Sequence, residues 1–243
     1  MAEIKQFYSQ NFDPIKRKKE NIKYVVFHYT GMKSEKSALK KLSDNKSKVS
    51  CHYFIKKNGS IINLVPDLYV SWHAGISNWK KLKNLNKFSI GIEIHNAGHQ
   101  FRYNSFNKKQ INSIKYLSLK LAKKYNFKRE HYLGHSDIAS DRKKDPGEKF
   151  PWEKLAKKGL VWFHNLDSKK IKKFRKTKLS SKFEENIFIS NLYKIGYKKI
   201  KGYKFNKNME YLTKAFQRRF RRDLVDGKID KECLTISKNL ISH

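Results

Sequence analysis

The sequence has few cysteines, few acidic residues and no long apolar run. Its two cysteines, Cys51 and Cys233, lie far apart, which excludes a disulfide framework and a CxxC metal pair. No run of about 18 apolar residues occurs, which argues against a transmembrane helix. The first residues lack the apolar stretch that a signal peptide needs. We therefore expect a soluble chain with no membrane span and no readable export signal.

Basic residues outnumber acidic ones by 56 to 21, which gives a formal net charge of +35. Such a charge attracts polyanions, including nucleic acid, anionic lipid and acidic wall polymer. The basic residues are mostly lysine, are spread over the whole chain and accompany many asparagines and isoleucines. A genome biased towards A and T produces this composition without any binding role. We favour that explanation and expect no nucleic-acid partner.

With 38% hydrophobic residues, the chain has enough apolar material for a buried core. Apolar patterns predict strands at 22–30 and 87–96, a hairpin around Asn58-Gly59, and a short strand at 131–137. Helical patterns occur at 34–44, 107–125 and 151–159. Three more helices are expected near 181–195, 208–220 and 230–240. We therefore predict an α/β domain over 1–163, a basic linker over 164–180 and a small all-α domain over 181–243.

Two histidines and one aspartate stand where strands and turns display side chains. His28 and His135 each lie at the end of an expected strand, and Asp145 is held in an Asp-Pro-Gly turn. Two histidines, a carboxylate and a water are a common ligand set for catalytic zinc. Hydrogen-bonded core histidines and a turn aspartate explain the same residues without a metal.

A glutamate and a lysine are candidates for the chemistry beside such a site. Glu93 lies opposite Ile90, Ile92 and Ile94 on its strand, and an acidic group there is costly to bury without a role. It could act as a general base, or face solvent on a one-sided sheet. Lys143 could stabilise an oxyanion, or be a surface residue in a run of three basic residues.

Several residues are candidates for lining a substrate cleft. Adjacent strand residues point to opposite faces, so Cys51 and His52 are not expected to share one ion. His52 or Tyr53 could line a cleft, and the loop with Trp72 and His73 could form a substrate wall or a packed turn.

Five ordered motifs over residues 22–163 resemble a known enzyme family. VVFHYT, SCHYFI, SWHAGISNW, SIGIEIHNAG and GHSDIASDRKKDPGEKFPW follow the order seen in zinc-dependent N-acetylmuramoyl-L-alanine amidases, in their AmiD-like branch, with AmpD and the peptidoglycan recognition proteins as relatives. The resemblance implies a mixed central β-sheet flanked by helices, with one zinc ion per chain. It implies that His28, His135 and Asp145 bind the zinc. It also implies that Glu93 is the catalytic acid/base and that Lys143 stabilises the transition state. Tyr53, Trp72, His73 and Asn96 are the expected substrate-binding residues.

The tail resembles a helical peptidoglycan-binding module. Its sequence YLTKAFQRRFRRDLVDGKIDKECLTI has an AFQ helix, an Asp-Gly turn and a last helix. The resemblance of residues 22–163 to the amidases implies hydrolysis of the amide between N-acetylmuramic acid and L-alanine in peptidoglycan or muropeptides. The tail favours the cell envelope or periplasm, whereas the missing signal peptide favours the cytoplasm. A non-catalytic peptidoglycan-binding protein and a basic nucleic-acid-binding protein are the alternatives.

Overall fold

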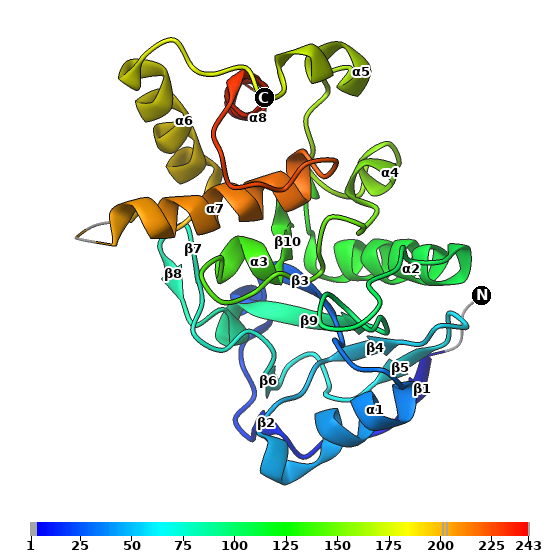
Figure 1. Cartoon of the computed structure of the whole chain (residues 1–243). Coiled ribbons are helices and arrows are strands. Elements are labelled where there is room, and N and C mark those ends of the chain that lie inside the picture. The colour runs from blue at the N-terminus through cyan, green and yellow to red at the C-terminus, as the bar shows by residue number, and fades with distance from the viewer. Residues whose placement is uncertain (1–3, 201, 203, 243) are drawn as a thin grey trace.

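The computed structural model describes residues 4–200, 202 and 204–242. A six-stranded sheet runs through the centre of the molecule (Figure 1). In spatial order its strands are β1 (Ile4–Gln6), β5 (Ile61–Asn63), β4 (Tyr53–Ile55), β9 (Ser89–Ile94), β3 (Tyr24–Tyr29) and β10 (Tyr132–Gly134). The central strands β4, β9, β3 and β10 are parallel, and β5 is antiparallel to β4. The sheet is therefore mixed, as predicted.

The hairpin between β4 and β5 turns at Gly59, as its sequence predicts. Gly59 has a φ of 87°, a conformation that favours glycine, and the amide of Lys56 donates to the carbonyl of Ser60 across the turn. The hairpin adds β4 beside β9 and so completes the floor of the sheet next to Glu93.

One face of the sheet is covered by two helices. α2 (Lys108–Tyr125) begins with a capping box between Asn107 and Gln110, and α4 (Trp152–Ala156) follows Pro151. Their apolar residues share a core with the predicted stripe of isoleucines on β9. The members of this core include Ile90, Ile92, Ile94, Ile114, Leu117, Leu121, Trp152 and Leu155.

The opposite face is covered at two separate places. α1 (Glu35–Ser43), capped by the side chain of Ser34, packs over Phe54 of β4. α3 (His135–Ile138) and the C-terminal helices cover Val26 of β3 and Leu133 of β10. Between these covers the sheet presents His28 and Glu93, which are direct neighbours in the pairing of β3 with β9.

The C-terminal helices share their core with the sheet. They are α6 (Lys182–Ile195), α7 (Phe205–Phe220) and α8 (Lys231–Ile241), together called the helical module below. Figure 1 shows α7 lying between α3 on one side and α6 and α8 on the other. Phe188, Phe216 and Leu240 belong to the same apolar cluster as Val26 and Leu133. The division into two domains with a linker stays a prediction.

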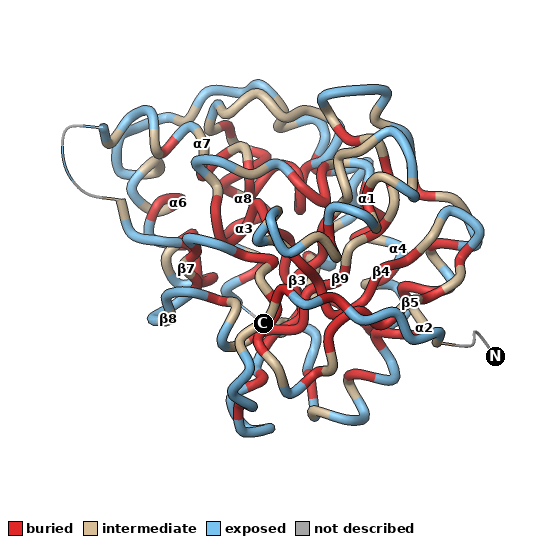
Figure 2. Tube along the Cα trace, turned by 90° about the horizontal axis from the view of Figure 1, so that it is seen from below, coloured by how far each residue is buried: buried red, intermediate tan, exposed pale blue. Residues whose placement is uncertain are grey.

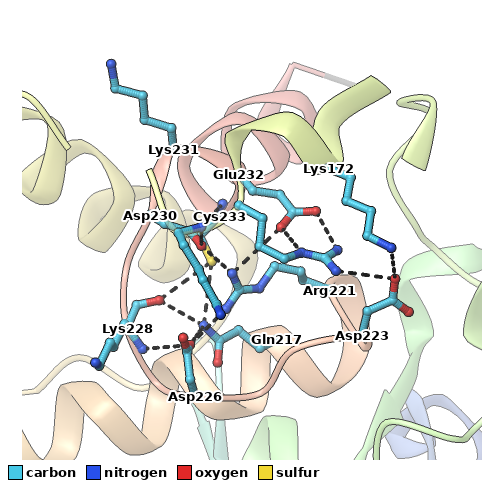
Figure 3. A network of polar contacts seen from close by, with 12 residues as sticks. Lys172, Gln217, Arg221, Asp223, Asp226, Lys228, Asp230, Lys231, Glu232 and Cys233 are labelled. Atoms are coloured by element: carbon cyan, nitrogen blue, oxygen red, sulfur yellow. Dashed lines mark hydrogen bonds and ion pairs between the residues drawn. The ribbon is translucent and has the colours of Figure 1, made fainter. Parts of the chain in front are cut away.

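The helical module also has a buried ionic network of its own. The guanidinium of Arg221, which follows α7, is buried among the carboxylates of Asp226, Asp230 and Glu232 (Figure 3). Arg175, from the segment before the module, pairs with Glu232 at 2.7 Å.

Several observed bounds differ from the predicted ones, and two of these differences lie next to the site or in the helical module. The chain leaves β10 at Gly134 and enters α3 at His135, where a strand as far as Asp137 was predicted. The carboxylate of Asp137 accepts a hydrogen bond from the amide of Gly134, which stabilises the start of a helix. α7 begins at Phe205 rather than at position 208.

The remaining elements are short. They are β2 (Phe12–Asp13), β6 (Val70–Ser71), β7 (Asn78–Trp79), β8 (Leu82–Lys83), α5 (Ser168–Ile171), η1 (Lys19–Asn21), η2 (Asn45–Ser47), η3 (Leu85–Phe88), η4 (Arg129–His131) and η5 (Lys172–Phe174). Among the described residues, no helix combines the length and the apolar character needed to cross a bilayer.

Candidate active site

A cavity of about 450 Å³ opens where the second face of the sheet is left uncovered. His28 and Glu93 form part of its floor, α3 supplies His135 as its first residue, and the loop that follows α3 supplies Asp145. Figure 2 shows that buried residues gather where β3, β9 and α3 meet. The structure therefore brings to one cavity all five residues that the sequence predicted to bind metal or to act in catalysis, including Lys143.

Three donor atoms lie close together, which we call the donor triad. The Nδ1 atom of His28 is 2.9 Å from Nδ1 of His135 and 3.0 Å from Oδ2 of Asp145. Nδ1 of His135 is 2.9 Å from the same carboxylate oxygen. All three side chains are buried. The group could hold one metal ion.

The second nitrogen of each histidine fixes which tautomer faces the triad. Nε2 of His135 lies 3.1 Å from the carbonyl oxygen of Ala74, which can only accept, so Nε2 carries the proton. Nε2 of His28 lies 3.1 Å from Nδ1 of His73, and Nε2 of His73 lies 3.2 Å from the hydroxyl of Ser89. The Ser89 hydroxyl donates to the carbonyl of Leu85, so it accepts from His73. His73 then accepts from His28, and both Nδ1 atoms present lone pairs to the triad.

This proton assignment fits a cation at the centre of the triad. Two imidazole lone pairs and a carboxylate oxygen would face one another at about hydrogen-bond distance with no proton between them, which is repulsive. A divalent cation removes that repulsion, and two neutral imidazoles with one carboxylate are donors that zinc accepts readily. Burial, followed by the charge of His135, lowers the pKa of His28 to about 4, so its imidazole is neutral at pH 7.

Glycine at position 91 makes room for the imidazole of His73. A Cβ atom at Gly91 would lie 2.3 Å from the ring of His73. The ring therefore occupies the space that a side chain on β9 would take, between Ser89 and Glu93. A glycine in a strand indicates a close approach, but the sequence alone does not say which side chain fills the space.

The Asp-Pro-Gly turn holds Asp145 in the triad. The carbonyl of Asp145 accepts from the amide of Ser136 at 2.8 Å, and the carbonyl of Pro146 accepts from the hydroxyl of Tyr103 at 2.7 Å. Gly147 has a φ of 81°, and a Cβ there would lie 2.3 Å from the Tyr103 hydroxyl. This turn therefore depends on glycine at 147.

Glu93 is a half-buried residue, and one of its two carboxyl oxygens is shielded from solvent. Its Oε2 atom is buried and has no hydrogen-bond partner among the described residues. Burial and the negative charge of Asp145 raise the pKa of Glu93 to about 8, and the positive charges of Lys143 and Lys41 oppose this. A carboxyl with a pKa near neutrality can both take and return a proton, as a general acid/base needs to do.

In the metal-free protein, Glu93→Gln is expected to become more stable relative to the wild type as the pH rises. The pKa of this carboxyl is raised on folding, from 4.5 to about 8. The folded state therefore keeps a proton that the unfolded state has lost, and the wild type loses stability as the pH rises from about 5 to 8. Glutamine has no such loss.

Chemical denaturation in the presence of a chelator measures this difference in the free energy of unfolding. The exposed Glu20 provides the control, because Glu20→Gln removes one negative charge from a solvent-exposed side chain. A difference between Glu93→Gln and the wild type that stays constant from pH 5 to pH 8 would contradict the raised pKa.

The three consecutive basic residues before Asp145 have different surroundings. Lys143 and Lys144 line the cavity. Arg142 also lines it, but its guanidinium donates to the carbonyls of Ala74 and Ile76 and so holds the loop that carries His73. Sequence reasoning left Arg142 without a role, because its partners are backbone atoms more than sixty residues away.

The predicted substrate-binding residues are only partly brought to the cavity. Trp72 and His73 line it. Tyr53 pairs with Ile92, so its side chain lies on the other face of the sheet, and its hydroxyl donates to Asp67. The amide of Asn96 donates to the carbonyl of Asn104 and its oxygen accepts from Gly98, so it holds a loop rather than facing the cavity.

A second polar chain at the cavity rim was not expected from the sequence. The hydroxyl of Tyr29 is 2.8 Å from Nδ1 of His99, whose Nε2 is 3.1 Å from the carboxylate of Glu148. Tyr29 and His99 both line the cavity. His99 stands just after the SIGIEIHNAG motif, and that proximity was the one signal for it.

A mixed sheet and the loop beside it that together present two histidines, an aspartate and a glutamate to one cavity are the arrangement of a single-metal hydrolase. Comparisons with known proteins agree. The model of the N-acetylmuramoyl-L-alanine amidase family matches residues 18–148. AmiD from Escherichia coli is 32% identical over 234 residues, which cover 90% of this chain and 82% of AmiD. The chain belongs to the N-acetylmuramoyl-L-alanine amidase family.

Solved structures of two relatives have the same fold over nearly the whole chain. The complex of E. coli AmiD with anhydro-N-acetylmuramic acid-L-Ala-D-γ-Glu-L-Lys superimposes with a TM-score of 0.80 and 31% identity, over 95% of this chain and 91% of that chain. AmpDh3 from Pseudomonas aeruginosa, in complex with anhydromuramic pentapeptide, has a TM-score of 0.79 and 28% identity, over 94% and 93%. The family, the enzyme class and the fold class predicted from the sequence are confirmed.

Proposed function

We propose that the chain hydrolyses the amide between the lactyl group of N-acetylmuramic acid and L-alanine, with one zinc ion held by His28, His135 and Asp145. The donor triad carries this proposal, because its three donor atoms lie within 3.0 Å of one another and face the cavity that contains Glu93. The two structural relatives were solved as complexes with muramyl peptides, which supports the substrate class.

In the proposed mechanism, this chain's residues orient the substrate and move the proton. Zinc, when bound, supplies a Lewis acid that lowers the pKa of the attacking water and polarises the amide carbonyl. The carboxylate of Glu93 takes the proton from the water as it attacks. Glu93 then gives that proton to the leaving amine of L-alanine, so the carboxylate is restored at the end of the cycle.

Lys143 supplies a fixed positive charge beside the reacting carbonyl. Attack of water on the amide moves negative charge onto the carbonyl oxygen, and a preorganised cation there stabilises the transition state more than the ground state. Lys143 lies two residues before Asp145 and lines the same cavity as Glu93. That proximity also accounts for its influence on the Glu93 carboxyl.

Substrate capture is proposed to use the charge of the cavity. The stem peptides of peptidoglycan carry carboxylates, and Lys41 and Lys144 line the cavity together with Trp72 and Met32. Cations on the rim raise the local concentration of an anionic ligand. We propose that Trp72 and His73 contact the substrate directly. Tyr53 and Asn96 are proposed to contribute only indirectly, by holding the structure around the cavity.

The decisive experiment is mass spectrometry of peptidoglycan and of 1,6-anhydro muropeptides after digestion. Release of free stem peptides beginning with L-alanine, abolished by a chelator and restored by zinc, supports the proposal. Stem peptides that appear equally with chelator present would overturn the metal assignment. Binding without any cleavage would favour a non-catalytic wall-binding protein, and retention on DNA that falls steeply with salt would favour a nucleic-acid binder.

We also propose that the helical module binds peptidoglycan and that the enzyme acts in the cell envelope on the wall itself. The predicted division at 163 and 181 separates the catalytic residues from this module. The test compares rates on intact sacculi and on soluble fragments. A strong preference for soluble anhydro muropeptides would favour a recycling enzyme in the cytoplasm.

Replacing Lys143 with methionine is expected to lower kcat by about 10² to 10³-fold, because the developing oxyanion loses its fixed cation. The zinc content should stay at one ion per chain, since Lys143 is not a ligand. Lys144→Met removes the same charge from the same loop and provides the comparison. If both variants lose activity equally, general electrostatic attraction rather than a placed cation explains the effect. Turnover is followed by chromatography of released stem peptide.

A further inference from the structure

Asp137 links the metal-binding loop to the helical module. It is the third residue of α3, two positions after His135, and it is buried. Its carboxylate accepts from the amide of Gly134 at 2.8 Å, from the hydroxyl of Tyr197 at 2.9 Å and from Nη1 of Arg219 at 2.7 Å. Tyr197 and Arg219 both come from the C-terminal part of the chain.

Arg219 is itself held on several sides. Its Nη2 donates to the carbonyl of Trp162 at 3.2 Å, and its guanidinium lies 4.4 Å from the ring centre of Trp152. The side chains of Arg219 and Asp137 are 3% and 1% exposed. A buried pair of this kind resists separation, because removing one partner leaves an uncompensated charge in the interior. The contact is therefore a stiff connection between α7 and α3.

The short helix α3 joins this contact to two members of the donor triad, His135 and Asp145. His135 is its first residue, and the amide of Ala139 donates to the carbonyl of His135 at 3.0 Å. The amide of Ser136, between His135 and Asp137, donates to the carbonyl of Asp145 at 2.8 Å. A helix of four residues has little stability of its own, so its position depends on what holds it from outside.

We propose that Arg219 and Tyr197 are positioning residues for the metal site, which act on His135 and Asp145 by holding Asp137. The inference rests on the proposed function, in which these residues bind zinc. The helical module then completes the catalytic site in addition to any role in binding peptidoglycan. Figure 1 shows the arrangement that this requires, with α3 lying directly against α7.

The expected effect is on metal affinity. If the contact is lost, α3 samples positions in which the donor triad is not assembled, and the apparent dissociation constant for zinc rises as the assembled fraction falls. Changes to groups that support metal ligands commonly weaken metal binding by about 10 to 100-fold. A role confined to general stability would leave zinc affinity unchanged at temperatures well below the unfolding transition.

Arg219→Met tests this in the full-length protein, with Arg221→Met as the matched control. Both arginines are buried and paired with carboxylates, but the partners of Arg221 are Asp226, Asp230 and Glu232, which all follow α7 in the chain (Figure 3). We expect zinc affinity, measured by competition with a chromophoric chelator, to fall at least about tenfold in Arg219→Met. The cobalt-substituted protein should show an altered visible spectrum. Arg221→Met should lower the Tm but change neither.

Tyr197→Phe is the milder variant and answers the question if Arg219→Met does not fold. It removes one hydroxyl from Asp137, and an affinity loss of about threefold is expected. Tyr193→Phe is its control, because that hydroxyl accepts from the amide of Ile200 within the C-terminal region. Equal zinc affinity in the wild type, Arg219→Met and Tyr197→Phe would overturn the inference. Wild-type protein that binds no zinc would instead overturn the proposed function.

Discussion

Replacing His28 with alanine is expected to remove bound zinc and to lower turnover by about 10⁴-fold or more, because the attacking water then keeps the high pKa of bulk water. The change deletes one corner of the donor triad and leaves only His135 and Asp145. Two protein ligands are fewer than the three that catalytic zinc sites retain. The imidazole of His73 also loses its partner, so the cavity floor changes around the missing ligand.

Elemental analysis after gel filtration measures the zinc, and release of stem peptide measures the turnover. His131→Ala is a suitable control, since His131 lies in η4 and its Nδ1 accepts from the amide of Lys128 outside the cavity. That variant should keep one zinc ion per chain and near wild-type activity. A His28→Ala protein with undiminished zinc would show that the ligand assignment is wrong.

The faces of the central strands could be predicted from the sequence because alternation in a strand is a local property. Ile90, Ile92 and Ile94 alternate with Gly91 and Glu93, and the structure places the isoleucines in the core under α2. His28 and Glu93 lie side by side because β3 and β9 pair in parallel. The same rule explains Tyr53, since a residue next to Phe54 points away from the cavity.

The supports of the site could not be predicted, because they join residues far apart in sequence through ordinary contacts. No role was predicted for Asp137, and it meets Arg219 across 82 positions. Nothing local distinguishes Arg219 from its neighbours in a chain with 56 basic residues. Arg142 is similar, because backbone carbonyls are its partners and any sequence could supply them.

Replacing Glu93 with glutamine is expected to lower kcat by about 10² to 10⁴-fold while the zinc content stays at one ion per chain. The amide has nearly the shape of the carboxylate, and Oε2 makes no hydrogen bond among the described residues that the change could break. Glutamine cannot take a proton from water, so the attack and the protonation of the leaving amine both fail. The donor triad keeps its three members.

The same change should stabilise the metal-free protein at pH 8, because the wild type has by then lost the stability that falls as the pH rises towards the raised pKa of Glu93. Loss of activity with a gain in stability is expected of a residue kept for chemistry and not for folding. Turnover and zinc content are measured on one preparation, with Glu20→Gln as the control for charge. Full activity in Glu93→Gln would exclude Glu93 as the base, and lost zinc would make it a support of the metal site. Retained zinc, lost turnover and raised stability together would identify Glu93 as the group that moves the proton.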